Sequence, residues 1–237
     1  MSKIGVITPT ADQPMGIRLA ETYMARQTVQ PDVWVVVDDG DKYASLTMGQ
    51  DHIRRTRDGE GGISLAKNML AALDFLGASC DVIVIWEHDD WYAPEHITTS
   101  INCLAAADIT GSKWQRYYNI KHQVYRVMLN VGSALCNTAF KTKIRDNLRR
   151  ACEHAIINKH YGIDRKFWES LGSIKKNIHG IDTVVGIKGL PGRPGLGMGH
   201  RPTKGSWIED NGQVVLRHWI GDDAEHYQIR AIAEERV

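Results

Sequence analysis

Three short runs of apolar, mostly β-branched residues stand out in the first 90 positions of the chain, at 4–8, 33–38 and 82–86. An apolar run without alternation suits a strand that is covered on both faces, as in a parallel sheet. Between the runs, apolar residues recur at helical spacing around 17–24 and again around 65–76, where Ser64 is placed to act as the N-cap. The resulting order of strands and helices predicts an α/β fold with a mostly parallel sheet flanked by helices.

Polar residues follow all three runs. The run endings read Thr8-Pro9-Thr10, Asp38-Asp39-Gly40-Asp41 and Glu87-His88-Asp89-Asp90. Ligands of such sheets collect beyond the carboxyl ends of the strands, so these residues are candidates for a binding site. Two of the three endings are acidic, and an acidic edge accepts a diphosphate only when a divalent cation lies between the two. Carboxylates spaced two apart suit Mg²⁺ or Mn²⁺, although an acidic strand end is also compatible with a solvated turn.

The composition is that of one soluble globular domain. The chain has 237 residues, of which 43% are hydrophobic and 24% charged. No apolar run reaches the roughly 18 residues of a membrane span, and no signal peptide is recognisable at the N-terminus. The four cysteines lack any Cys-x-x-Cys spacing, which argues against structural zinc and against a dithiol redox site. We therefore expect reduced, buried thiols and a cytoplasmic protein.

Four segments resemble, in the same order along the chain, the motifs of family 2-like GT-A glycosyltransferases. Residues 4–10 resemble the first donor-binding strand, 35–41 the second strand with its Asp-Asp-Gly turn, 62–68 the helix start that lines the nucleotide pocket, and 82–91 the Asp-x-Asp region. The resemblance implies a GT-A fold, a nucleotide-sugar donor, most often a UDP-sugar, and a divalent cation. It also implies that residues 1–112 form the donor half and 113–237 the acceptor and lid half of one domain.

The resemblance also assigns roles to single residues. The expected donor-binding residues are Thr8, Pro9, Thr10, Asp39, Lys67 and Asn68. Asp89 stands where the family binds its cation, and Glu87 replaces the first Asp of the motif. His200, in the glycine-rich segment 195–201 that suits a mobile lid, is the candidate that completes the metal shell, with His218 in reserve.

Asp164 is the expected catalytic base. It precedes an aromatic helix, as does the acidic pair that deprotonates the acceptor in inverting members of the family, although only one acid of that pair is present. The alternative is that Asp164 caps its helix. Asp90 and His160 are the next candidates for the base.

The second half of the chain predicts a strand at 123–130, helices near 142–155 and 164–171, and a hairpin turn at Asp210-Asn211-Gly212. Residues 113–176 carry 14 Lys and Arg against 4 Asp and Glu. Such a balance usually reflects solvated helix faces, but it also suits a polyanion. Together with the small size of the chain, it resembles phage-type enzymes that glycosylate hydroxymethylated pyrimidines in DNA. In that reading DNA phosphates would contact Lys141, Lys143, Arg145, Arg149 and Arg150, and a flipped base would stack on Trp114 or Tyr117.

Other readings of the same residues stay open. The acceptor could instead be a surface glycan, a lipid-linked sugar or a protein hydroxyl, none of which needs a basic stripe. A nucleotidyltransferase has a similar sheet and acidic site, but the chain lacks the usual N-terminal glycine-rich phosphate loop. A non-catalytic module that binds a nucleotide or glycan is the alternative from outside the enzymes.

Overall fold

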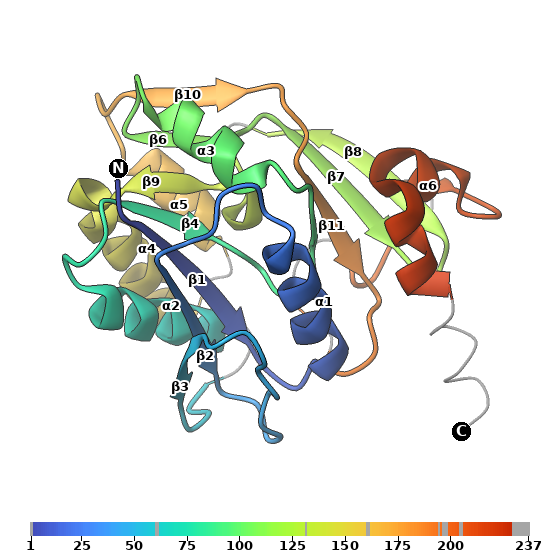
Figure 1. The fold of residues 1–237 in the computed structure, drawn as a ribbon, viewed down its shortest axis with the longest axis horizontal. Helices are drawn as coiled ribbons and strands as arrows, with labels where there is room; N and C mark the ends of the chain where they lie inside the picture. Colours follow the sequence, from blue (N-terminus) through green and yellow to red (C-terminus); the bar gives the residue numbers. More distant parts are fainter. Residues whose placement is uncertain are drawn as a thin grey trace.

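The computed structural model describes residues 2–59, 62–130, 132–159, 162–193, 195, 199–203 and 206–228. Two sheets form its framework, and helices cover both faces of the larger one (Figure 1). The elements are β1 (Ile4–Thr10), α1 (Pro14–Ala25), β2 (Val33–Asp38), β3 (Asp51–Arg54), α2 (Gly62–Leu76), β4 (Val82–Ile85), β5 (Trp91–Tyr92), α3 (His96–Leu104), β6 (Ile109–Ser112), β7 (Trp114–Asn119), β8 (Val124–Leu129), η1 (Leu135–Asn137), β9 (Ala139–Lys141), η2 (Thr142–Ile144), α4 (Arg145–Asn158), α5 (Ile163–Glu169), β10 (Lys176–His179), β11 (Val184–Lys188), β12 (Ile208–Glu209), α6 (Val214–Ile220) and η3 (Gly221–Ala224).

Seven of the described strands form the larger sheet, in the order β10-β6-β9-β4-β1-β2-β3. The pairs β4/β1, β1/β2, β2/β3 and β10/β6 are parallel, and β9 runs antiparallel to both of its neighbours. The predicted α/β fold with a mostly parallel sheet is therefore confirmed. Because β1, β2 and β4 run the same way, their carboxyl ends meet at one edge of the sheet.

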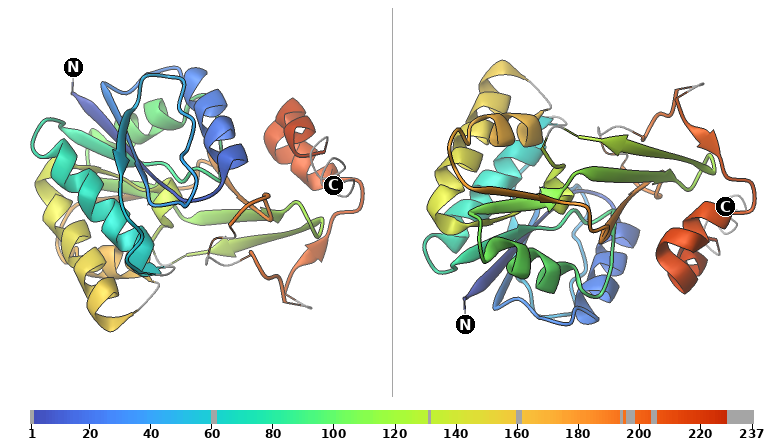
Figure 2. Two further views of the ribbon diagram at one scale, coloured as in Figure 1. Left: turned by 90° about the horizontal axis from the view of Figure 1, so that it is seen from below. Right: turned by 90° about the horizontal axis from the view of Figure 1, so that it is seen from above.

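The strand β4 shows why the apolar runs have no alternation. Val82, Val84 and Trp86 pack into the core on the side of α1 and α3, whereas Ile83 and Ile85 pack into a second core with α2, α4 and α5. Figure 2 shows these helices on the two faces of the sheet. Since both faces are buried, every position of the strand has to be apolar.

A smaller sheet in the order β12-β8-β7-β11-β5 adjoins the larger one. Its strand β11 runs parallel to β7, so that Lys188 at the end of β11 pairs with Asn119. The helix α6 covers part of this sheet, where Trp219 packs edge-on against Tyr125 with ring centroids 5.5 Å apart (Figure 2). This second sheet brings residues from the end of the chain back to the strand ends of the first.

Two local predictions were wrong, and one strand was missed. Residues 210–212 do not form a hairpin, because the Asp210 carboxylate accepts hydrogen bonds from the Val215 and Leu216 amides and so caps α6. Ser64 is not an N-cap, since α2 begins at Gly62 and the Ser64 hydroxyl donates to Asp39. The edge strand β3 after β2 was not predicted, because its burial is too slight to leave an apolar pattern.

Two expectations drawn from composition concern membrane-spanning helices and cysteines. None of their helices has the length and apolar character that a membrane span requires. All four cysteines are free thiols, and Cys80, Cys136 and Cys152 are buried whereas Cys103 is partly exposed.

Candidate functional site

An acidic cluster follows β4 at the carboxyl edge of the larger sheet. Glu87, Asp90 and Cys136 each place one possible ligand atom within 4.8 Å of the other two. Asp89, from the same loop, joins the cluster through Lys188. The structure thus brings together the acids that were expected from the sequence, and it adds a thiol from η1.

Lys188 lies between two of these acids. Its ammonium donates to Asp90 Oδ1 at 2.9 Å and to Asp89 Oδ2 at 3.2 Å, although the residue is only 5% exposed. Asp90 Oδ1 also accepts from the Ile187 amide at 3.1 Å, which ties this carboxylate to β11. Asp90, 1% exposed, therefore lies in a position that suits anchoring the cluster rather than reaching an acceptor.

The electrostatics of the cluster follow from this packing. Burial raises the pKa of Asp90 to about 6. Burial and the nearby charge of Asp90 raise the pKa of Glu87 well above its usual value. Lys188 holds the pKa of Asp89 below its usual value even though burial opposes this. One ammonium among three carboxylates leaves a deficit of two positive charges when all three are ionised.

A divalent cation fits this arrangement. It would remove the charge deficit, and carboxylate oxygens are the ligands that Mg²⁺ and Mn²⁺ prefer. In the part of the chain that the structure describes, Asp90 Oδ2 is buried without a hydrogen-bond partner, and a bound cation would satisfy this oxygen. The residues that are placed to hold the cation are Asp89, Glu87 and Asp90.

His200 approaches the cluster, whereas His218 does not. His200 Nε2 lies 3.8 Å from Asp89 Oδ2, and burial lowers the pKa of this histidine to about 4, which keeps the imidazole neutral. A neutral imidazole is the form that binds metals. His218 lies exposed on α6. Of the proposed lid 195–201, Leu196, Gly197 and Met198 lie outside the described residues.

Asp164 lies in the first turn of α5, and its charge is among those that raise the pKa of Glu87. Burial raises the pKa of Asp164 itself. Its Oδ1 accepts the Arg165 amide at 2.7 Å, so the carboxylate also satisfies an amide at the start of the helix. His160, the other candidate for the base, lies outside the described residues.

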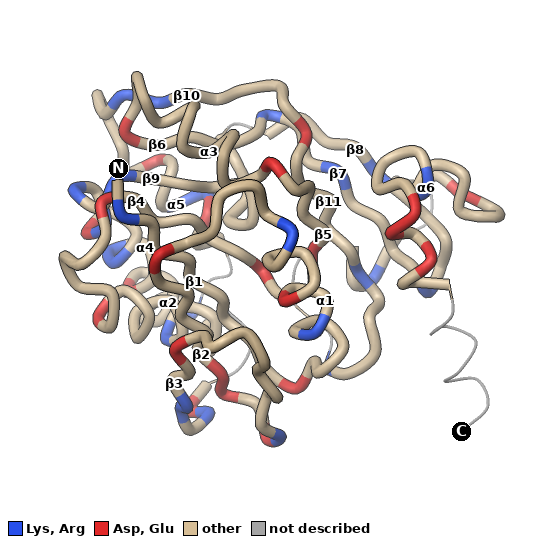
Figure 3. The backbone as a smooth tube through the Cα atoms, viewed as in Figure 1, with Lys and Arg blue, Asp and Glu red and all other residues tan. Residues whose placement is uncertain are grey.

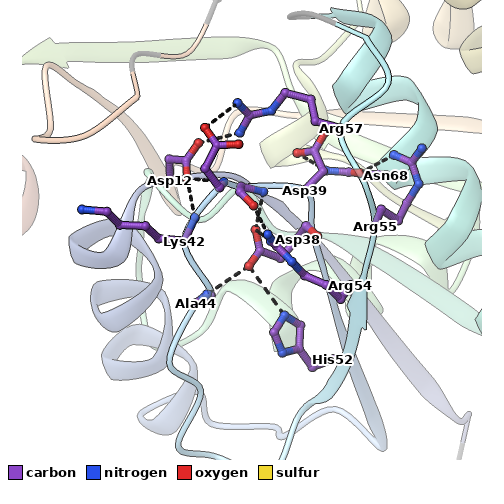
Figure 4. Close-up of polar contacts among 12 residues, drawn as sticks. Asp12, Asp38, Asp39, Lys42, Ala44, His52, Arg54, Arg55, Arg57 and Asn68 are labelled. Carbon is purple, nitrogen blue, oxygen red and sulfur yellow. Dashed lines mark hydrogen bonds and ion pairs between the residues drawn. The ribbon is translucent and has the colours of Figure 1, made fainter.

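The candidate nucleotide pocket lies at the end of β2 (Figure 4). Asp39 accepts from the Asn68 amide at 3.2 Å and from the Ser64 hydroxyl, and Asn68 in turn accepts from Arg55 at 2.8 Å. A cavity of about 380 Å³ opens beside Asp39. It is lined by Asp39, Gly40, Asp41, Tyr43, Arg54, Arg55, Thr56 and Arg57.

The other expected donor residues lie in different surroundings. Thr8 is fully buried and its hydroxyl accepts from Trp34 Nε1 at 2.8 Å, so this side chain belongs to the core. The Pro9 carbonyl lies 2.9 Å from His88 Nδ1, and the Thr10 carbonyl accepts from the Asp39 amide at 3.3 Å. Lys67 forms an ion pair with Asp58 at 2.6 Å. At the end of β1, Pro9 and Thr10 thus make their contacts near the pocket through backbone carbonyls, whereas the Thr8 side chain lies in the core.

The expected basic surface lies at the wrong end of the sheet. Lys141 pairs in register with Val82, the first residue of β4, whereas the acids follow its last residue. At 3.3 Å per residue this separation is about 16 Å. Figure 3 shows the basic residues around β9 and α4 beside the N-terminus.

Most of these cations also have local partners. Lys141 and Lys143 pair with Asp108, Arg149 pairs with Asp74, and Arg145 donates to the Gly77 carbonyl. Arg150 is exposed. The prediction that this set borders the acceptor side of the site was wrong, because β9 runs antiparallel to β4 and carries the basic segment back to the opposite edge.

A scan against protein-family models and a search of curated proteins find no match to this chain. Among solved structures, S. aureus TarS 1-349 in complex with UDP matches with a TM-score of 0.51 at 15% identity, over 78% of this chain and 60% of that one. The mannosyltransferase PcManGT from Pyrobaculum calidifontis, in complex with GDP-Man and Mn²⁺, matches with a TM-score of 0.52 at 16% identity, over 80% and 57%. The chain has the GT-A fold. It spans less than two thirds of the length of either GT-A structure.

Sequence reasoning missed several residues of this candidate site. Lys188 ends an apolar run at 184–187, and its position at the end of a buried strand is the same signal that identified the acids. Tyr117, expected only as a stacking partner for a flipped base, lies beside Lys188, whose ammonium is 6.0 Å from the centre of the tyrosine ring. Cys136 and Arg55 give no such signal, because only the folded chain brings them to the strand ends.

Proposed function

We propose that this chain is a glycosyltransferase that transfers a sugar from a nucleotide-sugar donor, with UDP the expected nucleotide, to an acceptor hydroxyl. The observation that carries the proposal is the acidic cluster of Glu87, Asp89 and Asp90, which lies at the same edge of a GT-A sheet as the Asp39 pocket. The bound ligands of the two solved structures, UDP in one and GDP-Man with Mn²⁺ in the other, support this reading.

Each group in the site has a role in the proposed reaction. The Asp39 carboxylate accepts hydrogen bonds from the ribose or base of the donor, and the Asn68 amide donates hydrogen bonds to it. A divalent cation held by Asp89, Glu87 and Asp90, with His200 close by, would offset the charge of the departing nucleoside diphosphate. Asp164 accepts the proton of the acceptor hydroxyl as that oxygen attacks the anomeric carbon.

The acceptor is proposed only as a hydroxyl compound. Tyr117 lies beside Lys188, with its ring centroid 6.5 Å from that of Trp207, and aromatic faces suit a ring-shaped acceptor such as a sugar or a base. The five cations that suggested hydroxymethylpyrimidine in DNA lie at the opposite edge of the sheet. The proposal therefore does not extend to DNA.

The test is donor hydrolysis without acceptor. The protein is incubated with a panel of nucleotide sugars in Mn²⁺, and released nucleoside diphosphate is measured. We expect release from one donor, loss of release on chelation, and a fall of at least about a hundredfold in Asp89→Asn. The control Asp146→Asn changes the same group on an exposed residue of α4 and should release at the wild-type rate.

Three results would contradict the proposal. Release of pyrophosphate in a parallel incubation with a nucleoside triphosphate and a sugar 1-phosphate would indicate a nucleotidyltransferase. Tight nucleotide binding without any release, with or without candidate acceptors, would indicate a binding module. Full activity of Asp89→Asn, at an unchanged melting temperature, would remove the cluster from the reaction.

A further inference from the structure

The lysine within the acidic cluster points to a second way of holding the donor. We infer that the Lys188 ammonium binds the diphosphate of the nucleotide sugar, so that donor binding is weakened but not lost when the divalent cation is removed. The inference rests on the proposed function, because it concerns the same site.

The ammonium already lies where a cation is needed. It spans Asp90 Oδ1 and Asp89 Oδ2, and Asp89 is the acid expected to bind the metal. Asp90 is also held by the Ile187 amide. Among the described residues, the observed polar contacts of the Asp89 side chain are Lys188 and His200. Lys188 thus supplies a positive charge at this carboxylate with no metal present.

The backbone on both sides of Lys188 packs closely around its side chain. Gly189, the next residue, has a φ of +82°, and a Cβ there would lie 2.9 Å from Asn119 Oδ1. The Asn119 amide donates to the Gly199 carbonyl at 2.7 Å, and a Cβ on Gly199 would lie 3.1 Å from Lys188 Cγ. Two glycines and one asparagine therefore hold the chain closely around the lysine stem.

A donor in the Asp39 pocket would direct its phosphates toward this ammonium. The strand β1 lies between β2, which ends in the pocket, and β4, which leads into the acidic cluster. With strands about 4.8 Å apart, pocket and cluster are separated by about 10 Å, which is the reach of a nucleoside diphosphate. A charge in such a water-poor position acts more strongly than one on the surface.

The charge balance explains why a divalent cation would still add affinity. Lys188 offsets one of the three carboxylates, and the diphosphate adds further negative charge. A divalent cation therefore strengthens the binding that the ammonium supports, and its removal leaves the weaker, lysine-dependent part.

The experiment measures binding by calorimetry, with UDP and uridine and with GDP and guanosine as probes, in Mn²⁺ and in EDTA. In EDTA the wild-type protein should bind one of the diphosphates at least about tenfold more tightly than its nucleoside. Lys188→Met should lose this preference, and Lys188→Arg should keep it to within about threefold. Lys143→Met, a lysine at the far edge of the sheet, is the matched control and should match the wild-type protein.

The measurements in Mn²⁺ separate the outcomes. Binding of the diphosphate to Lys188→Met in Mn²⁺ shows that the variant is folded. If the wild-type protein binds the diphosphate only in Mn²⁺, the inference is overturned and the proposed function stands, and this result does not depend on any variant. The same holds if Lys188→Met keeps its preference in EDTA. If neither diphosphate binds under any condition, the proposed function fails as well.

Discussion

Asp89 and Asp90 both accept from Lys188 but differ in pKa, because the balance between burial and nearby positive charge differs at the two acids. Asp89 faces Lys188 and His200 and has a lowered pKa, whereas burial raises the pKa of Asp90 to about 6. His88, between Glu87 and Asp89 in sequence, hydrogen-bonds to the Pro9 carbonyl and lies against Gln13. This histidine binds the loop to β1 and leaves the acids on the side of Lys188.

Asp164 is the residue whose role a conservative substitution can decide. In Asp164→Asn we expect turnover to fall by about a hundredfold or more, since general bases contribute 10² to 10⁴. The amide oxygen of Asn still accepts from the Arg165 amide, so the melting temperature and the nucleotide affinity should change little. Steady-state kinetics, calorimetry and thermal unfolding of one preparation measure all three. Unchanged turnover would assign Asp164 to the helix start alone.

At the scale of elements, the turn between β4 and β5 places the acids. Trp86 and Tyr92 stack with ring centroids 3.7 Å apart and an interplanar angle of 14°, which closes the loop 87–90. The Tyr92 hydroxyl accepts from the Glu87 amide at 2.7 Å. Two buried rings therefore fix the backbone from which the acidic side chains project.

Removing that hydroxyl tests the role of the turn. Tyr92→Phe leaves the Glu87 amide without its acceptor, which costs about 1–3 kcal/mol of unfolding free energy. We expect turnover to fall as well, because the loop loses a contact at the acidic cluster. Chemical denaturation and donor hydrolysis are the measurements, with Tyr125→Phe in the smaller sheet as the control. A stable Tyr92→Phe with wild-type turnover would show that ring stacking alone sets the loop.

At the scale of the whole molecule, distant parts of the chain close around the first helix. Asp223 in η3 accepts from Trp91 Nε1 at 2.6 Å and pairs with Arg26 at 2.6 Å. The hydroxyls of Tyr23 and Tyr227 hydrogen-bond at 2.7 Å within the core. These contacts join the last described residues to α1 and β5, next to the acidic turn.

The core of the molecule also contains a histidine that should make its stability depend on pH. His96 is 2% exposed and contacts Thr183 Oγ1 at 2.7 Å, and burial lowers its pKa to about 3. Between about pH 6.5 and 3 the unfolded chain binds a proton at this residue that the folded chain does not. The unfolding free energy therefore falls as the pH falls through this window, by up to about 1.4 kcal/mol per pH unit from this group.

Denaturation curves from pH 7 to pH 4 measure this contribution. His96→Asn should show a slope smaller by up to about that amount, whereas His122→Asn, at an exposed histidine, should keep the wild-type slope. Equal slopes in all three proteins would show that His96 is protonated in the folded state.

Much of the fold and part of the site could be predicted from the sequence. The runs at 4–8, 33–38 and 82–86 are strands as expected, since a strand covered on both faces can contain only apolar residues. The acids that end the third run had to lie at the same edge as Asp39, because parallel strands align their carboxyl ends. The proximity of His200 to Asp89 was also expected, through the resemblance rather than through any local pattern.

The sequence by itself determined the sheet and the edge where the acids collect, because burial and strand direction act within a few residues of each run. Only the tertiary structure decided what faces those acids. Lys188 reaches them from a strand of the second sheet about 100 positions later in the chain, and Cys136 reaches them from η1. The reversal of β9 turned the basic segment to the far edge. These placements depend on the pairing of strands that are far apart in sequence. That pairing cannot be predicted from the local spacing of residues.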